Sequence, residues 1–347
     1  MSKEDFKHFE ARDAQFRNSK GKVRPAPVLQ AGVPVADTHC HIGMLEDPAW
    51  ELARAAAHGV RFIECMTDPG EKNPDERQAE ETYELLPQWR QQANALLAEW
   101  GLTGVEAPHV RCACGVHPHN ACYWEATEPR LRALLENPLS SCIGEIGLDY
   151  HYDFSPRGEQ REVFALQLRM AQELNLPVEL HIREAHEEAL QILEREGVPQ
   201  AGCVLHCFNL GPEDVKPFVE LGCYIALGGP LTFKKECATR AAVALVPSKR
   251  LLTETDAPYM APEPCRGVAC GPAHTAYTLR MLLDCMGYGD DGEVGALALM
   301  TPRAIDVPEG EEPQPLLVPD FDAWQDELTQ VQMAHRIYDN AVALLDR

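Results

Sequence analysis

The sequence predicts an α/β protein, a (β/α)8 or TIM barrel that forms a single domain with an N-terminal extension. Three observations support this prediction. The chain has 347 residues, of which 45% are hydrophobic, so it suits one large barrel with a sizeable core. Short runs rich in Val, Ile and Cys alternate with longer stretches of helical period, as in βα units. Eight such runs occur, which is the number of strands in this barrel.

The expected elements follow one another in this alternating order after a short start. Residues 1–32 form an extension with a charged, helical beginning and a connector, "GKVRPAPVLQAG", which contains two prolines. The expected strands cover residues 33–39, 60–66, 109–115, 141–146, 177–182, 202–206, 222–227 and 250–254. The helices between them include residues 81–100, 157–175, 184–196, 212–221 and 234–246.

One stretch near the C-terminus interrupts the alternation. Residues 287–325 are rich in Gly and Pro and hold nine acidic residues against one basic residue, Arg303, a net charge of −8. We interpret this stretch as an acidic, partly mobile surface insertion without chemistry of its own. Residues 326–345 regain helical spacing and are expected to close the barrel, so the hydrolase-like domain spans residues 33–347.

Composition restricts the environment and the partners. The polar N-terminus and the absence of a long apolar run predict a cytoplasmic protein without membrane contact. Thirteen scattered cysteines then read as reduced thiols. The formal net charge of −23 opposes a polyanion, so a phosphate-bearing substrate requires a locally positive site. Aromatic residues are only 7% and form no stripe with basic residues, so extended stacking on a single strand is not expected.

Polar side chains gather where the predicted strands end. "DTHCHIG" ends the first strand, "GEIGLDY" the fourth, "ELHIR" the fifth and "VLHCF" the sixth, and "LTETDAP" follows the last. The carboxyl ends of barrel strands form one rim, where active sites are built. The residues brought there are His39, His41, Glu145, His181, His206 and Asp256. Four imidazoles and two carboxylates are a ligand set for two divalent ions such as Mg²⁺, Mn²⁺ or Zn²⁺.

The same motifs carry a family resemblance. "DTHCHIG", "GVHPH", "GEIGLDY", "LPVELHIREA", "LHCFN", "LGGPLTFKK" and "LLTETDAPYMAP" occur in this order, and residues 33–285 closely resemble the TatD family of metal-dependent deoxyribonucleases. The resemblance implies a TIM barrel of the amidohydrolase superfamily that trims DNA from the 3′ end. The sequence departs from the family pattern after residue 261. There "CRGVACGPAH" stands in place of the family's Asn before a Pro, with Cys270 near that position.

The resemblance also implies how the ligands divide. His39, His41, Glu145 and Asp256 would hold one ion, and Glu145, His181 and His206 the other, so that Glu145 bridges. Two dications less two carboxylate charges leave about +2 at the mouth, which attracts phosphate. A hydroxide between the ions would then attack phosphorus, with Asp256 as the general base.

Residues around the ligands have two interpretations each. Asp37 and Glu254 are expected to accept ring N–H bonds from ligand histidines, or else are ordinary strand-end carboxylates. His117 and His119 are expected to contact substrate, or else lie on the surface. Arg183 suits a phosphate, or else forms a salt bridge to a neighbouring helix.

Three functions stay open at this point. The first is a two-metal phosphodiesterase acting on nucleic-acid ends, without a stable protein partner. The second is a metal-dependent ester or amide hydrolase, such as a D-aminoacyl-tRNA deacylase, which the negative charge favours. The third is a non-catalytic barrel scaffold. Cys265 and Cys270 lie near the expected site, but no partners for a zinc knuckle occur beside them.

Overall fold

Eight strands pair in chain order and form one parallel sheet. The computed structural model describes residues 14–27, 29, 32–72, 77–288 and 328–347. Each strand pairs in parallel with its neighbour in the sequence. The strands are β3 (Val35–Cys40), β4 (Val60–Thr67), β5 (His109–Cys114), β6 (Ser140–Asp149), β7 (Val178–Arg183), β8 (Cys203–Leu205), β9 (Tyr224–Leu227) and β10 (Leu251–Thr253).

The first and last strands of this sheet meet and nearly close it into a barrel. A parallel bridge joins Cys40 to Ala257. The Asp256 N–H donates to the His39 carbonyl oxygen at 2.9 Å, and the His41 N–H donates to the Ala257 carbonyl oxygen at the same distance. The eight expected strands are therefore present, and the predicted (β/α)8 barrel is confirmed.

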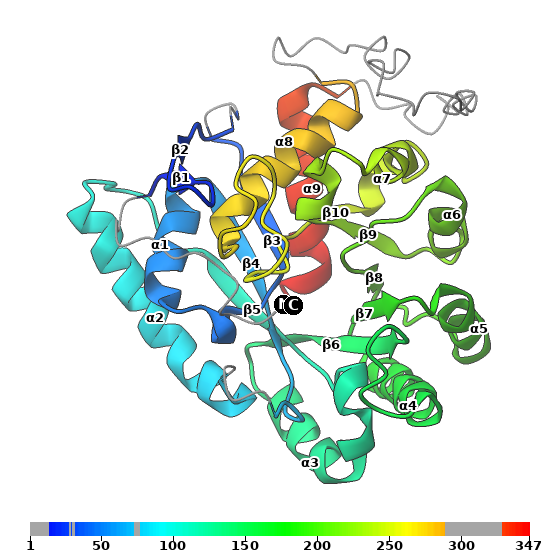
Figure 1. The fold of residues 1–347 in the computed structure, drawn as a ribbon. Coiled ribbons are helices and arrows are strands. Elements are labelled where there is room, and N and C mark those ends of the chain that lie inside the picture. The colour runs from blue at the N-terminus through cyan, green and yellow to red at the C-terminus, as the bar shows by residue number, and fades with distance from the viewer. Residues whose placement is uncertain (1–13, 28, 30–31, 73–76, 289–327) are drawn as a thin grey trace, which may run out of the picture.

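The helices surround the sheet, as Figure 1 shows. They are α1 (Pro48–Ala57), α2 (Ala79–Glu99), α3 (Trp124–Leu135), α4 (Arg157–Leu174), α5 (His186–Glu196), α6 (Pro212–Glu220), α7 (Cys237–Val243), α8 (Thr275–Cys285) and α9 (Gln330–Leu345). The helix expected over residues 234–246 is shorter, because its first residues close a turn in which the Glu236 N–H donates to the Phe233 carbonyl oxygen. No described helix combines the length and apolar character that a membrane span needs.

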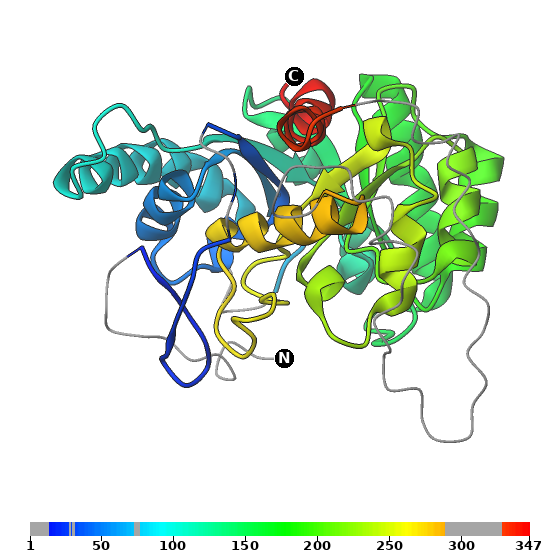
Figure 2. The same ribbon diagram turned by 90° about the horizontal axis from the view of Figure 1, so that it is seen from above.

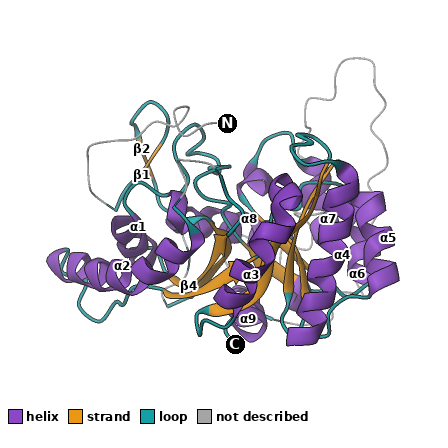
Figure 3. Ribbon diagram, turned by 90° about the horizontal axis from the view of Figure 1, so that it is seen from below, coloured by secondary structure: helices purple, strands orange, loops and turns teal. Residues whose placement is uncertain are grey.

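Helix α9 closes the amino end of the barrel, as expected for residues 326–345. Its residues Ala341, Leu344 and Leu345 pack against side chains from the barrel interior, among them Phe62. The Asn340 amide donates to the carbonyl oxygens of Ser248 and Leu251, both at 2.9 Å. Figures 2 and 3 show α9 at one end of the barrel and the β1–β2 hairpin at the other.

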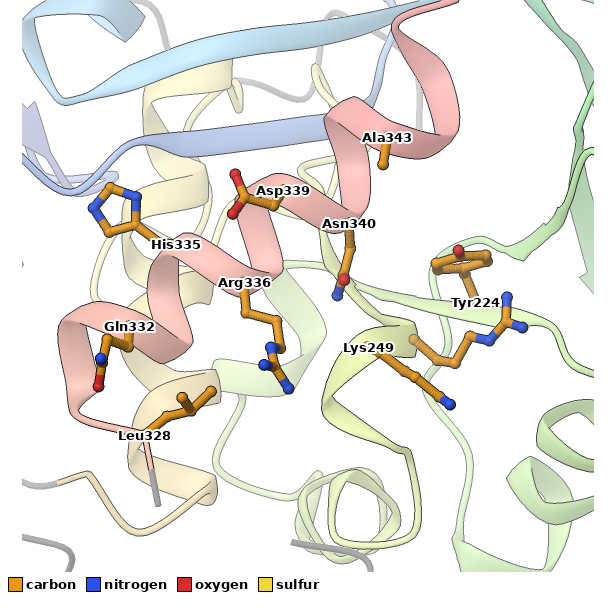
Figure 4. Close-up of a pocket in the computed structure, with 10 residues that line it drawn as sticks. Tyr224, Lys249, Leu328, Gln332, His335, Arg336, Asp339, Asn340 and Ala343 are labelled. Atoms are coloured by element: carbon orange, nitrogen blue, oxygen red, sulfur yellow. The ribbon is translucent and has the colours of Figure 1, made fainter. Parts of the chain in front are cut away.

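An open hollow of about 640 Å³ lies beside α9 at this amino end (Figure 4). Lys249, Arg250 and Arg336 line it, and the Arg250 guanidinium lies 4.5 Å from the centre of the Tyr224 ring. The predicted site residues come from the opposite ends of the strands, so none of them lines this hollow.

Two predicted segments lie largely outside the described residues. The helical start of the extension falls on residues 1–13, and most of the acidic insertion falls on residues 289–327. The described part of the extension holds a hairpin of β1 (Phe16–Arg17) and β2 (Val23–Arg24), which the sequence reasoning missed. Phe16 anchors it, because its ring is buried beneath the Arg54 guanidinium, 4.9 Å away.

Candidate metal centre

The six predicted ligands come from five segments at the carboxyl end of the barrel. His39 lies on β3, with His41 directly after it, and Glu145 lies on β6. His181 lies on β7, and His206 directly follows β8; Asp256 follows β10 by three positions. The β6–β7 register shifts between Ile143 and Ile146, and such a bulge re-aims the side chain it contains, here Glu145.

Glu145 is the centre of the cluster, because each of its carboxylate oxygens faces a different pair of imidazoles. Its Oε2 lies 3.6 Å from His39 Nε2 and 3.8 Å from His41 Nε2. Its Oε1 lies 2.6 Å from His181 Nδ1 and 2.9 Å from His206 Nε2. We call these groups the His39/His41 half, which includes Asp256, and the His181/His206 half.

The His39/His41 half has the spacing of ligands around one ion. Its two Nε2 atoms are 3.3 Å apart, and Asp256 Oδ1 lies 3.6 Å from His41 Nε2 and 3.8 Å from His39 Nε2. Ligands that bind Zn²⁺ tetrahedrally at 2.0–2.2 Å lie about 3.3–3.6 Å from one another. These donor atoms therefore fit a divalent ion with little movement.

The His181/His206 half is held together by hydrogen bonds instead. The rings of His181 and His206 both donate to Glu145 Oε1, at 2.6 and 2.9 Å, which are hydrogen-bond distances and are shorter than the spacing of two ligands in a tetrahedral zinc site. His117 lies close by, with its Nε2 3.8 Å from the same oxygen, and these donors of His117, Glu145 and His181 form a group that could hold an ion. An ion in this half requires those two hydrogen bonds to open.

Electrostatics separate the two halves in the same way. Burial lowers the pKa of His39, and the neighbouring His206 lowers it further. Burial also acts to lower the pKa of His206, but Glu145 and Glu254 outweigh it and raise that pKa well above its ordinary value. Burial acts to raise the pKa of Glu145, but His206 and His181 outweigh it and hold that pKa well below the usual range. Glu145 is therefore the ionised partner of the cluster.

Two buried carboxylates lie behind the imidazoles. The His39 Nδ1–H donates to Glu179 Oε1 at 2.7 Å, and His206 Nδ1 lies 3.5 Å from Glu254 Oε1. Both carboxylates are fully buried, whereas His41 and Asp256 are partly exposed on the other side. The donors of His39, Glu179, His206 and Glu254 also form a group that could hold an ion, on this closed side of the cluster.

Glu179 was missed in the sequence, and it makes the ring contact expected of Asp37. The Asp37 carboxylate accepts hydrogen bonds from the Thr255 hydroxyl at 2.7 Å and from the backbone N–H groups of Thr255 and His39. Asp37 therefore ties β3 to the segment after β10. The sequence offered one signal for Glu179: it is a charged residue in an otherwise apolar strand, two positions before His181 and therefore on the same face.

The predicted substrate-contacting residues lie on the His181 side of the cluster. The rings of His117 and His181 are 4.5 Å apart, and those of His117 and His119 are 4.3 Å apart. Arg183 forms no salt bridge with the described residues of a neighbouring helix; its guanidinium lies 4.8 Å from the centre of the Tyr152 ring. The structure thus brings all three near the rim.

Asp149 is a second buried carboxylate that the sequence reasoning missed. Its Oδ2 accepts hydrogen bonds from His119 Nε2 at 2.8 Å and His181 Nε2 at 3.2 Å. Burial acts to raise the pKa of Asp149, but these two hydrogen bonds help to hold that pKa well below its usual value. The sequence did carry a signal for Asp149, because it lies in the same "GEIGLDY" motif as Glu145.

The two cysteines near the expected site do not form a metal site within the described residues. Cys265 and Cys270 are both buried, and burial raises the pKa of each thiol. Neither belongs to a group of ligand atoms that could hold an ion among the described residues. They pack in the core as small apolar side chains.

A TIM barrel that gathers imidazoles and carboxylates at the carboxyl ends of its strands defines a metal-dependent hydrolase. Comparison with known proteins agrees with this class. A family model described as TatD related DNase matches residues 36–294. The chain belongs to the TatD-related DNase family.

Individual relatives share much of the chain. The uncharacterized metal-dependent hydrolase YcfH of Escherichia coli K12 is 35% identical over 245 residues, which are 69% of this chain and 83% of that protein. The 3'-5' ssDNA/RNA exonuclease TatD of the same strain is 41% identical over 150 residues, 43% of this chain and 58% of that protein. The crystal structure of YJJV, a TatD homologue from Escherichia coli K12, superposes with a TM-score of 0.64 at 25% identity and covers 90% of this chain and 98% of that one.

Proposed function

We propose that the protein is a phosphodiesterase that uses two divalent ions to remove nucleotides from the 3′ end of single-stranded DNA. The observation that carries the proposal is the convergence of four imidazoles and two carboxylates around Glu145, at the barrel end where substrates bind. The exonuclease named among the relatives supports the substrate class.

Each half of the cluster supplies ligands in this proposal. His39, His41 and Asp256 would hold one ion together with Glu145, and His181 and His206 would hold the other together with Glu145. Bound divalent ions lower the pKa of water and neutralise phosphate oxygens, which makes a nucleophile available near neutral pH. The two buried carboxylates Glu179 and Glu254 fix the ring orientations from behind.

Asp256 takes the proton of the attacking water. Its carboxylate is partly exposed, unlike Glu179 and Glu254, so it is open to solvent and substrate at the rim. A general base must lie within hydrogen-bond reach of the proton that it accepts, and Asp256 lies beside both imidazoles of its half. His117 and His119, on the opposite side, are placed to contact the phosphate or to protonate the leaving oxygen.

A direct test uses the metal-loaded protein and a single-stranded oligonucleotide labelled at its 5′ end. We expect a ladder of products shortened from the 3′ end in Mg²⁺ or Mn²⁺. Asp256→Asn should abolish the ladder, whereas the exposed Asp339→Asn, at the opposite end of the barrel, should leave it unchanged. Elemental analysis of the same samples reports metal content.

The same samples decide between the two enzymatic functions. Hydrolysis of D-aminoacyl-tRNA or of a panel of simple esters, without shortening of DNA, would replace the phosphodiesterase by an ester hydrolase. Absence of every activity, with Asp256→Asn indistinguishable from the unaltered protein, would favour the non-catalytic scaffold.

A further inference from the structure

Exposed apolar side chains concentrate around the mouth of the candidate metal centre. In the part of the chain that the structure describes, six large hydrophobic side chains are exposed. Four of them, Tyr123, Tyr152, Phe154 and Met260, lie on segments that follow the carboxyl ends of β5, β6 and β10. Exposure of this kind costs solvation free energy, and its concentration at one rim indicates a binding surface.

Two of these side chains and one arginine form what we call the aromatic ledge: Tyr152, Phe154 and Arg183. The rings of Tyr152 and Phe154 stack with their centroids 5.3 Å apart and their planes 18° from parallel. The Arg183 guanidinium lies over the Tyr152 ring at 4.8 Å. Phe154 is 66% exposed and Tyr152 is 42% exposed, so the ledge offers ring surface to a ligand.

The loop that carries the ledge is fixed by buried groups. Asp149 Oδ1 accepts hydrogen bonds from the backbone N–H groups of His151 and Tyr152, both at 2.9 Å. The buried Gln160 amide donates to the Ser155 carbonyl oxygen at 2.8 Å, just after Phe154. A preformed surface loses less entropy when it binds a ligand.

A short series of contacts connects the ledge to the cluster. The His119 ring lies edge-on to Phe154, with ring centroids 4.8 Å apart. His119 Nε2 and His181 Nε2 both donate to Asp149 Oδ2. A nucleotide whose phosphate lies at the His181/His206 half therefore has its base within reach of the Phe154 ring.

We propose that the aromatic ledge stacks the nucleobase of the terminal nucleotide while Arg183 neutralises an adjacent phosphate oxygen. This inference rests on the proposed function and adds a subsite to it. An aromatic ring beside a guanidinium suits a single-stranded nucleotide, because every base presents a π-face and every linkage carries a negative charge. The ledge has only two rings, so it fits an enzyme that trims single nucleotides and does not require a long stacking stripe.

The first test compares strands that do and do not carry a base on the last nucleotide. With the metal-loaded protein we expect Phe154→Ala to raise KM for the base-containing strand by about 5- to 150-fold, the range that stacking of one base supplies. KM for a strand with an abasic last nucleotide should stay within about twofold, as should kcat on both strands, because stacking acts in binding. Phe154→Leu should resemble Phe154→Ala, and Phe154→Trp should keep or lower KM.

A matched control removes an exposed apolar side chain far from the rim. Leu174 is exposed at the end of α4, so Leu174→Ala should leave both KM values unchanged. Because Phe154 is mostly exposed, its substitution should also leave the thermal unfolding midpoint unchanged. A KM for the base-containing strand that Phe154→Ala does not alter would overturn the proposal.

A second measurement does not depend on hydrolysis. A strand that ends in 2-aminopurine, with a phosphorothioate as its last linkage, should lose fluorescence when it binds the metal-loaded protein, because stacking quenches this base. Phe154→Ala and Tyr152→Ala should abolish the quenching. Quenching that persists in both variants, or none with the unaltered protein, would overturn the ledge. Quenching that depends on Phe154 without any strand shortening would keep the ledge and reject the proposed phosphodiesterase.

Discussion

The two halves of the cluster share one carboxylate but differ in how ready their donor atoms are for an ion. In the His39/His41 half the atoms lie 3.3–3.8 Å apart, a spacing that one ion can span. In the His181/His206 half the same carboxylate accepts hydrogen bonds at 2.6 and 2.9 Å. The difference teaches that one carboxylate can face donor atoms spaced for an ion on one side and donor groups hydrogen-bonded to it on the other.

This difference has a thermodynamic consequence under the proposed function. An ion that enters the His39/His41 half loses no hydrogen bond between ligands. An ion that enters the His181/His206 half replaces two charge-assisted hydrogen bonds, each worth about 1.5–3 kcal/mol. We therefore expect sequential binding, with the His39/His41 half filled first.

The largest expected effect comes from removing what the halves share. Glu145→Gln should lower the rate of DNA hydrolysis by more than about 10³-fold, because neither half keeps its bridging carboxylate. Both the rate and the metal content should fall. Glu64→Gln is the matched control: Glu64 is buried in the barrel beside Ser141, outside the cluster, and burial raises its pKa. If Glu145→Gln kept its metal and its rate, Glu145 would not be the bridge.

Removing one imidazole from each half tests the order of binding. His206→Ala should leave about one ion per chain, because all donors of the His39/His41 half are untouched. His41→Ala should weaken the first ion itself, so less than one ion should remain after gel filtration. Elemental analysis at matched protein concentration measures both. If His206→Ala kept less metal than His41→Ala, the His181/His206 half would be the one that fills first.

The carboxylates behind the rings offer a matched pair of substitutions with smaller effects. Glu179 backs His39 and Glu254 backs His206. Each change to Gln should weaken metal binding by about 10- to 100-fold, since such partners orient the ligand ring. Titration calorimetry should assign the loss for Glu179→Gln to the first binding event and the loss for Glu254→Gln to the second. Equal losses in both events would show that the halves do not act separately.

The sequence predicted the fold and the six converging side chains for one physical reason. Parallel strands end at one rim, so residues such as His181 and His206 could be placed together without knowing any contact. The partners behind the rings could not be found in this way. Glu179 meets His39 across 140 positions, and strand parity gives the face of a side chain but not its depth in the barrel. Asp37 shares that face, yet it lies one layer below His39 and bonds to the adjacent segment at Thr255.

The aromatic ledge was also beyond composition and periodicity. Tyr152 and Phe154 lie on a loop, and Arg183 comes from the end of the next strand. Their approach depends on the Asp149 hydrogen bonds that shape the loop. A low aromatic content correctly argues against a long stripe, but it does not exclude a single stacking position built by tertiary contacts.

The last expected effect is on stability, and it results from a backbone contact beside His181. Gly147 pairs with His181 at φ +141°, and a Cβ there would lie 2.1 Å from the His181 carbonyl oxygen. Gly147→Ala should therefore lower the free energy of unfolding by about 1–3 kcal/mol and displace His181. Gly158→Ala, in α4 with no atom closer than 4.0 Å to the added carbon, should be neutral or stabilise by up to about 1 kcal/mol. Urea denaturation measures both changes. If Gly147→Ala matched Gly158→Ala in stability and kept full metal content, the close approach of β6 to β7 would not be what places His181 beside Glu145.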